Sequence, residues 1–199
     1  MHDKLTPDVR GLETDAYDQG GYFTLAQARG RRVSRQLLDH HVRRGRFQRV
    51  QRGLYRLSGF PSAEHDEMRE IWMAVGVDRA VLTHESALAL LELSDNIPDA
   101  VHLLVARRHR GMRARPGVAI HTRPDDEQVS TVWRDGLTLT APARTLVDVV
   151  DSLQPEQAEV AVRQALERGL ATERQIADEA ARRGKRAAIE AVLAGARAA

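Results

Sequence analysis

The sequence predicts an α+β fold, in which helical and extended stretches occupy separate parts of the chain. Apolar residues recur at the three- and four-residue spacing of helices over residues 7–44 and again after residue 62. Short runs with strand character follow each of these stretches, at 47–57 and within 101–140. Helical spacing returns after residue 142, and strands do not alternate with helices as they do in a parallel sheet.

The first two helices are short and are separated by glycine. The first is predicted over residues 7–19, before Gly20, with three apolar residues on one side: Val9, Leu12 and Ala16. Thr24 then caps a second helix. We expect Gly30 to end that helix by adopting the left-handed conformation that other residues resist.

The third helix carries the most informative pattern. Ser34 begins it as an N-cap, and Gly45 follows its last turn. One arc of the helix holds Leu37, Leu38, His41 and Val42. The other arc holds Gln36, Asp39, His40 and Arg43. One side can therefore pack on the domain, while the other is free to form hydrogen bonds.

A β-hairpin is predicted directly after the third helix. Two short runs, 47–50 and 54–57, flank a turn at residues 51–53. Three helices followed by a hairpin is the element order of a winged helix-turn-helix, in which the third helix enters the major groove and the hairpin is the wing. We therefore predict a DNA-binding domain over residues 1–60.

Positive charge is concentrated on this domain. The chain has a net charge of +2, but residues 29–56 hold ten arginines and one acid, Asp39, a local charge of +9. Such a concentration favours a polyanion partner, because each arginine placed against a phosphate releases condensed counterions. The alternative is a solvated arginine-rich surface.

The predicted DNA-binding residues lie on the third helix and the hairpin: Ser34, Arg35, Gln36, His40, Arg43, Arg44, Arg46, Arg49, Arg52 and Arg56. Gln36 suits adenine and Arg43 suits guanine at the base edges, with His40 supporting them. Ser34 and Arg35, at the helix start, suit a phosphate. Asp39 could accept a hydrogen bond from a cytosine amino group, but we expect it to pair with Arg35 or Arg43 on the same helix. The hairpin arginines would contact phosphate or the minor groove, unless the wing serves only for packing.

Residues 61–199 are predicted to form the mixed α+β domain. Helices begin after Ser62 and Thr83, strands follow, residues 132–140 turn at Asp135-Gly136, and helices end the chain. Between two of these strands lies a second cluster of arginines: Arg107, Arg108, Arg110, Arg113 and Arg115. It is either a second polyanion contact or a solvated loop.

No enzyme motif is recognised. Thr83, His84 and Glu85 are contiguous and so point in different directions, which favours a helix start over a catalytic triad. Arg144 and Asp148 have the spacing of an ion pair within a helix. The eight histidines lack zinc-ligand spacing, and phosphate-binding glycine loops are missing. We expect no catalytic residue, no metal and no cofactor. The lack of cysteine and of long apolar runs favours a soluble cytoplasmic protein without membrane contact.

Several segments resemble the AbiEi-type antitoxins of bacterial type IV toxin–antitoxin systems: Gly21–Thr24, Val33–Leu38, Gly45–Leu57, Thr83–Leu88 and Thr140–Asp148. The resemblance covers about residues 20–150. It implies a winged helix-turn-helix joined to an antitoxin domain, repression of its own operon, and opposition to a nucleotidyltransferase toxin without a stable complex. Some similar chains continue into a Vsr-like endonuclease domain. This sequence ends at Ala199, so we expect no such activity.

The hypothesis is therefore a DNA-binding, non-enzymatic antitoxin and autorepressor acting on double-stranded DNA. One winged domain reads about one half-site, so we expect two copies on an inverted repeat. The alternatives are a stand-alone winged-helix transcriptional regulator, a nuclease-related protein using residues around Glu85 and Asp148, and an adaptor whose winged domain is structural.

Overall fold

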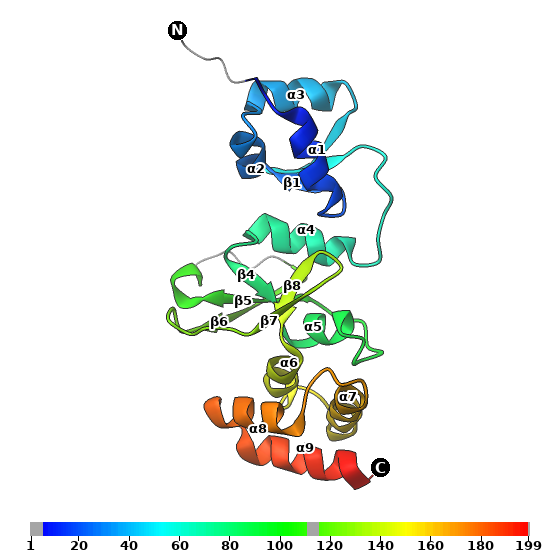
Figure 1. The fold of residues 1–199 in the computed structure, drawn as a ribbon, viewed down its shortest axis with the longest axis vertical. Coiled ribbons are helices and arrows are strands. Elements are labelled where there is room, and N and C mark those ends of the chain that lie inside the picture. The colour runs from blue at the N-terminus through cyan, green and yellow to red at the C-terminus, as the bar shows by residue number, and fades with distance from the viewer. Residues whose placement is uncertain (1–5, 111–115, 199) are drawn as a thin grey trace. The chain divides into compact units, whose positions relative to one another are not determined.

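A computed structural model describes residues 6–110 and 116–198 (Figure 1). The chain is α+β, as predicted, and divides into two compact units, Met1–Gly76 and Val77–Ala199. Each is described here by itself. No helix in the described part of the chain is both long enough and apolar enough to cross a bilayer.

The first unit has the element order and sheet of a winged helix-turn-helix. Its elements are α1 (Val9–Tyr17), β1 (Tyr22–Thr24), α2 (Leu25–Gly30), α3 (Arg35–Arg43), β2 (Phe47–Gln51), β3 (Leu54–Leu57) and α4 (Asp66–Val75). The three strands are antiparallel in the order β1-β3-β2. The predicted helices and hairpin are thus confirmed, and β1 is an additional strand of three residues.

Side-chain caps define where the helices begin. The Gly11 N–H donates to Asp8 at the start of α1, at 2.8 Å, and lowers the pKa of that carboxyl. Thr24 forms a capping box with Gln27 at the start of α2. Ser34 Oγ accepts from the Leu37 N–H at the start of α3. The predicted caps at Thr24 and Ser34 are therefore confirmed.

The end of α2 differs from the prediction. Gly30 is the last residue of α2 and does not have a positive φ. The left-handed residue is instead Arg32, with φ 60°. Its N–H donates to the Arg29 carbonyl, and the Val33 N–H donates to the Ala28 carbonyl. These bonds satisfy backbone carbonyls at the end of the helix. The left-handed residue is thus Arg32, two residues after the predicted Gly30.

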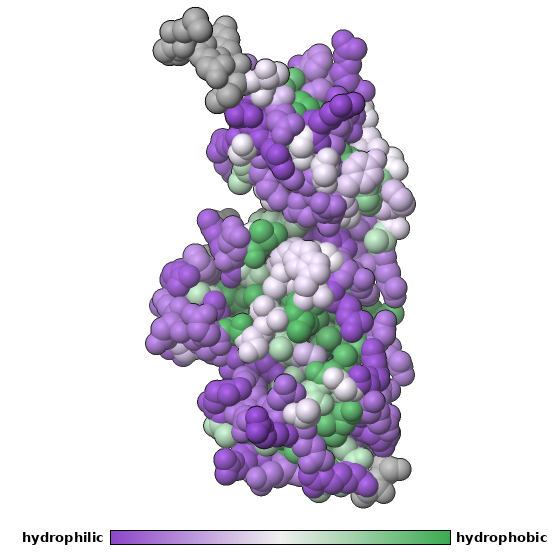
Figure 2. All heavy atoms as spheres, viewed as in Figure 1, coloured by the Kyte–Doolittle hydropathy of each residue, from purple (hydrophilic) through white to green (hydrophobic). Residues whose placement is uncertain are grey.

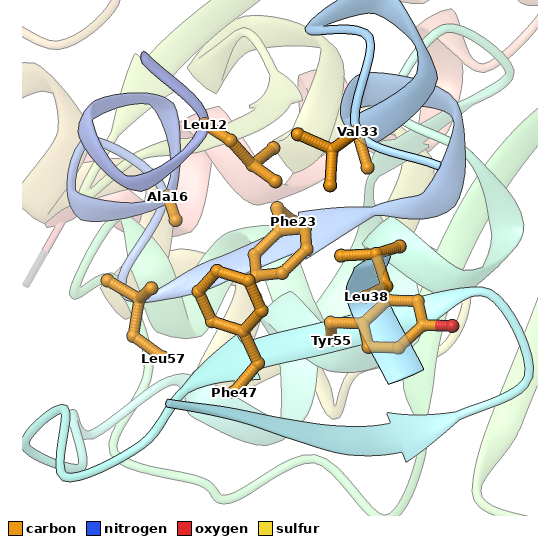
Figure 3. Close-up of a cluster of buried hydrophobic side chains, with 9 residues drawn as sticks. Leu12, Ala16, Phe23, Val33, Leu38, Phe47, Tyr55 and Leu57 are labelled. Atoms are coloured by element: carbon orange, nitrogen blue, oxygen red, sulfur yellow. The ribbon is translucent and has the colours of Figure 1, made fainter. Parts of the chain in front are cut away.

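An aromatic core joins the helices to one face of the sheet. Phe23 lies between Phe47 and Tyr55, with ring centroids 4.9 and 5.5 Å away (Figure 3). Leu12 from α1 and Leu38 from α3 are fully buried against this cluster. Burial of these side chains holds α3 on the sheet with one defined side inward.

Helix α4 belongs to the first unit, which therefore extends past the predicted boundary at residue 60. The strand register places Tyr22 opposite Arg56, on the face away from Phe23 and Tyr55. Helix α4 packs against β1 and β3 and supplies Asp66, whose carboxylate binds Arg56. The compact units divide at Gly76 because this helix covers the second face of the sheet.

The second unit contains a mixed five-stranded sheet and a group of helices. Its elements are β4 (Ala80–Leu82), α5 (His84–Leu90), β5 (Val101–Ala106), η1 (Arg107–His109), β6 (Val118–Arg123), β7 (Thr131–Arg134), β8 (Leu137–Thr140), α6 (Pro142–Val149), α7 (Pro155–Glu167), α8 (Glu173–Arg182) and α9 (Arg186–Ala198). The strand order is β6-β5-β4-β8-β7. Helices α6 to α9 pack on one another (Figure 1). The turn at Asp135-Gly136 is confirmed, with positive φ at both residues.

A buried ion-pair network connects this sheet region to α6 and α8. The predicted pair forms, with Arg144 Nε 2.8 Å from Asp148 Oδ2, but both side chains are almost fully buried. The Arg144 guanidinium also binds Glu127 and Glu179. The pair is therefore part of a network across three segments and not only a contact within one helix.

Candidate nucleic-acid interface

Helix α3 presents its polar arc to solvent. Gln36, His40 and Arg43 are exposed, while Leu38 on the opposite arc is fully buried. His41 lies against Phe47, with ring centroids 5.2 Å apart, and burial lowers the pKa of its imidazole. The helix is thus oriented as its sequence pattern predicts, and Figure 2 shows a mainly hydrophilic surface on the visible side of the first unit.

The turn before α3 is held by ion pairs to α1. Arg31 Nη1 lies 3.0 Å from Asp8 Oδ2, and Nη2 lies 2.7 Å from Asp15 Oδ1. Arg31 therefore fixes the turn on α1 and contributes little free charge to the surface. Next to it, Arg32 is exposed in the left-handed conformation. Both arginines contribute to the +9 charge of residues 29–56. The sequence alone does not distinguish Arg31, which forms ion pairs, from the exposed Arg32.

The hairpin carries two exposed arginines. Arg52 occupies the turn with Gly53, whose φ is +82°. Arg49 lies opposite Tyr55 in the strand register, so it is on the sheet face that packs against α1 and α3. A bulge at Val50 follows it. Because α3 packs against β2, Arg49 extends the exposed surface that begins on α3.

Five of the predicted arginines have no bound carboxylate among the residues that the structure describes: Arg35, Arg43, Arg44, Arg49 and Arg52. All five are exposed. No ion pair joins Asp39 to Arg35 or Arg43 in the described chain, contrary to our expectation for Asp39. The guanidinium groups of the five exposed arginines therefore keep their hydrogen-bond donors available for bidentate contacts to phosphate or guanine.

Two predicted arginines are engaged within the fold. Arg46 Nε lies 2.6 Å from Glu13 Oε1, although 45% of its side chain is exposed. Arg56 is only 15% exposed; its guanidinium binds Asp66 at 2.7 Å and the Pro61 carbonyl at 2.9 Å, and it lies over the Tyr22 ring. We therefore correct the role expected of Arg56, because these contacts occupy the group that would have to reach DNA.

The second arginine cluster is described only in part. Arg107, Arg108 and Arg110 are exposed in and after η1. Asp125 accepts from the Arg108 N–H at 3.0 Å and lies 3.8 Å from its guanidinium. The remaining members, Arg113 and Arg115, lie outside the described residues.

Residues 16–58 match the sequence model of a family described as transcriptional regulator, AbiEi antitoxin. No curated protein matches this chain. The matched segment begins near the end of α1 and closes just after β3. It therefore includes both helices of the helix-turn-helix and the whole hairpin.

Proposed function

We propose that this protein is a DNA-binding antitoxin, because residues 16–58 match the sequence model of a family described as transcriptional regulator, AbiEi antitoxin. It represses its own operon and counteracts a nucleotidyltransferase toxin. The observation that carries the DNA-binding part is a set of exposed arginines on α3 and the hairpin that bind no carboxylate among residues 6–110 and 116–198. The apolar arc of α3 is packed on the domain, with Leu38 fully buried.

The helix and the hairpin would have different tasks. In the major groove, Gln36 would contact adenine and Arg43 would contact guanine, because each side chain presents paired groups that match one base edge. Arg35 and the backbone N–H groups at the start of α3 would hold a phosphate there. Arg49 and Arg52 would follow the backbone beside the groove, which positions the helix without reading sequence.

Two copies of the chain would read one operator. A single recognition helix covers one half-site. Specific binding with a dissociation constant of about 10⁻⁸ M normally requires more contacts than one such module makes. An inverted repeat with half-sites spaced by about one helical turn would bring two recognition helices to the same side of the duplex.

A transcriptional reporter tests the repression. The DNA upstream of this gene is fused to a reporter, and the wild-type chain is expected to reduce its output. The double variant Arg43→Ala/Arg52→Ala should restore it, whereas Arg174→Ala should not; Arg174 is an exposed arginine of α8. Reporter output that the wild-type chain does not reduce would contradict autorepression.

Co-expression with the adjacent gene tests the antitoxin part. We expect that gene to encode a nucleotidyltransferase that stops growth, and this chain to restore growth without co-purifying with the toxin. Repression without rescue would instead favour a stand-alone regulator.

A further inference from the structure

Three histidines distant in the sequence meet in the second unit. His84 begins α5, His102 lies in β5 and His121 lies in β6. One ring nitrogen from each lies within 4.8 Å of the other two. Each imidazole is only partly exposed. The expectation that the histidines form no metal site rested on sequence spacing, and the fold brings together residues that this spacing separates.

Strand pairing brings the three histidines together. Strands β5 and β6 run parallel with Leu104 opposite His121, so His102 lies two residues away on the same sheet face. The Thr83 N–H donates to the His102 carbonyl at 3.0 Å, which places the start of α5 beside β5. His84 follows at once with φ 49°, an uncommon backbone conformation for a residue other than glycine. Such strain is often found at functional sites.

Two of the three rings already bring their nitrogens close together. His102 Nδ1 lies 3.0 Å from His121 Nε2. His84 stacks on His121, with ring centroids 3.5 Å apart. Ligand nitrogens about 2.0–2.1 Å from a tetrahedral zinc ion lie about 3.4 Å from one another. Binding would therefore require rotation of the His84 ring out of its stack, without a change in the strands.

The carboxylate of Glu85 binds the His102 ring nitrogen that is not the proposed ligand atom. His102 Nε2 lies 2.8 Å from Glu85 Oε2. A histidine that binds a metal through one nitrogen commonly donates its other N–H to a carboxylate, which fixes the tautomer and strengthens the ligand. Ser86 Oγ accepts from the His102 backbone N–H at 2.9 Å and further fixes this segment.

We propose that His84, His102 and His121 bind one divalent transition-metal ion of the zinc type, with Glu85 as the positioning residue for His102. Three imidazoles favour Zn²⁺ and its neighbours over Mg²⁺ or Ca²⁺, which prefer oxygen ligands. Three protein ligands also leave a fourth position for water or another small ligand. The site lies in the second unit, and this proposal relies on neither DNA binding nor the antitoxin role.

Metal titration of the full-length chain tests this site. The protein is stripped with a chelator and titrated with Zn²⁺ in competition with a chromophoric indicator. The expected result is one tight site. His102→Ala should abolish it, and Glu85→Gln should weaken it by about 10–100-fold, the usual effect of losing such a partner. The matched control is His65→Ala, which removes a histidine at the start of α4 in the first unit and should bind like wild type.

A second measurement uses the wild-type chain, so its result does not depend on how a variant folds. Co²⁺ bound by the wild-type chain should give the visible bands of a tetrahedral site, and Zn²⁺ should displace them. Absence of these bands together with no tight Zn²⁺ site would overturn the proposal. So would a tight site that His84→Ala, His102→Ala and His121→Ala all leave unchanged.

Discussion

At the scale of residues, the arginines of the first unit occupy two chemical situations. Arg31 and Arg56 bind carboxylates of neighbouring helices and stabilise the fold. Arg43 and Arg52 are exposed and bind no carboxylate of the described chain. Only the second kind can neutralise a phosphate without first breaking an internal ion pair, so the +9 charge of residues 29–56 overstates what DNA would meet.

Arg56→Gln should destabilise the first unit without changing DNA recognition. The substitution leaves Asp66 without its 2.7 Å partner, and a hydrogen bond to a charged group contributes about 1.5–3 kcal/mol. Urea unfolding should show a loss of that size, while the salt dependence of DNA binding stays the same. A shallower salt dependence would show that Arg56 does contact phosphate.

Arg43→Ala and Arg52→Ala should weaken DNA binding in different ways. Loss of a base contact at Arg43 should reduce the preference for operator over random DNA by about 1–3 kcal/mol. Loss of a phosphate contact at Arg52 should weaken both DNAs alike and flatten the salt slope by about 1. Binding curves on the two duplexes distinguish these outcomes; equal losses from both variants would contradict the assigned roles.

At the scale of elements, Leu38 is the fully buried side chain that holds α3 on the sheet, and Leu37 and Val42 pack beside it. Leu38 is fully buried against the aromatic cluster of Phe23, Phe47 and Tyr55. Leu38→Ala should lower the free energy of unfolding by about 2–5 kcal/mol, because it removes apolar contacts and leaves a cavity. Arg35→Ala, on the exposed side of the same helix, is the control and should change stability little. Thermal unfolding followed by circular dichroism measures both, and equal effects would contradict the packing.

The buried network around Arg144 is the corresponding feature of the second unit. Arg144→Met would leave the carboxylates of Glu127, Asp148 and Glu179 short of a cation and should cost about 3–5 kcal/mol. Arg182 also binds Glu179 but is 67% exposed, so Arg182→Met should cost about 0–1 kcal/mol. Chemical denaturation compares the two, and similar losses would argue against a structural role for the network.

Signals between neighbouring residues predicted the helices and the hairpin of the first unit. The histidine cluster of the second unit depends on strand pairing between distant residues, and the sequence did not predict it. Caps at Thr24 and Ser34 and the turn glycine Gly53 each act within a few residues, so their effects can be derived from sequence. The meeting of His84, His102 and His121 depends on the order and register of β4, β5 and β6. Sequence spacing carries no information on that register, which is why the cluster was not predicted.

At the scale of the whole molecule, each compact unit carries its own chemistry. The first unit holds the cationic surface and the segment matched to AbiEi antitoxins. The second holds the histidine cluster and the buried ion-pair network. The domain boundary predicted at residue 60 missed α4, since contacts from Asp66 to Arg56 join this helix to the sheet.

The salt dependence of DNA binding distinguishes a DNA-binding surface from an arginine-rich surface that is only solvated. Fluorescence anisotropy of the full-length chain is measured on a duplex from upstream of its gene and on a shuffled duplex, from about 50 mM to about 200 mM salt. We predict tighter binding to the upstream duplex and a linear fall of log K with log salt concentration, with a slope of about −0.9 for each phosphate neutralised. Binding that is absent on both duplexes, or insensitive to salt, would contradict the assignment of α3 and the hairpin as a DNA-binding surface.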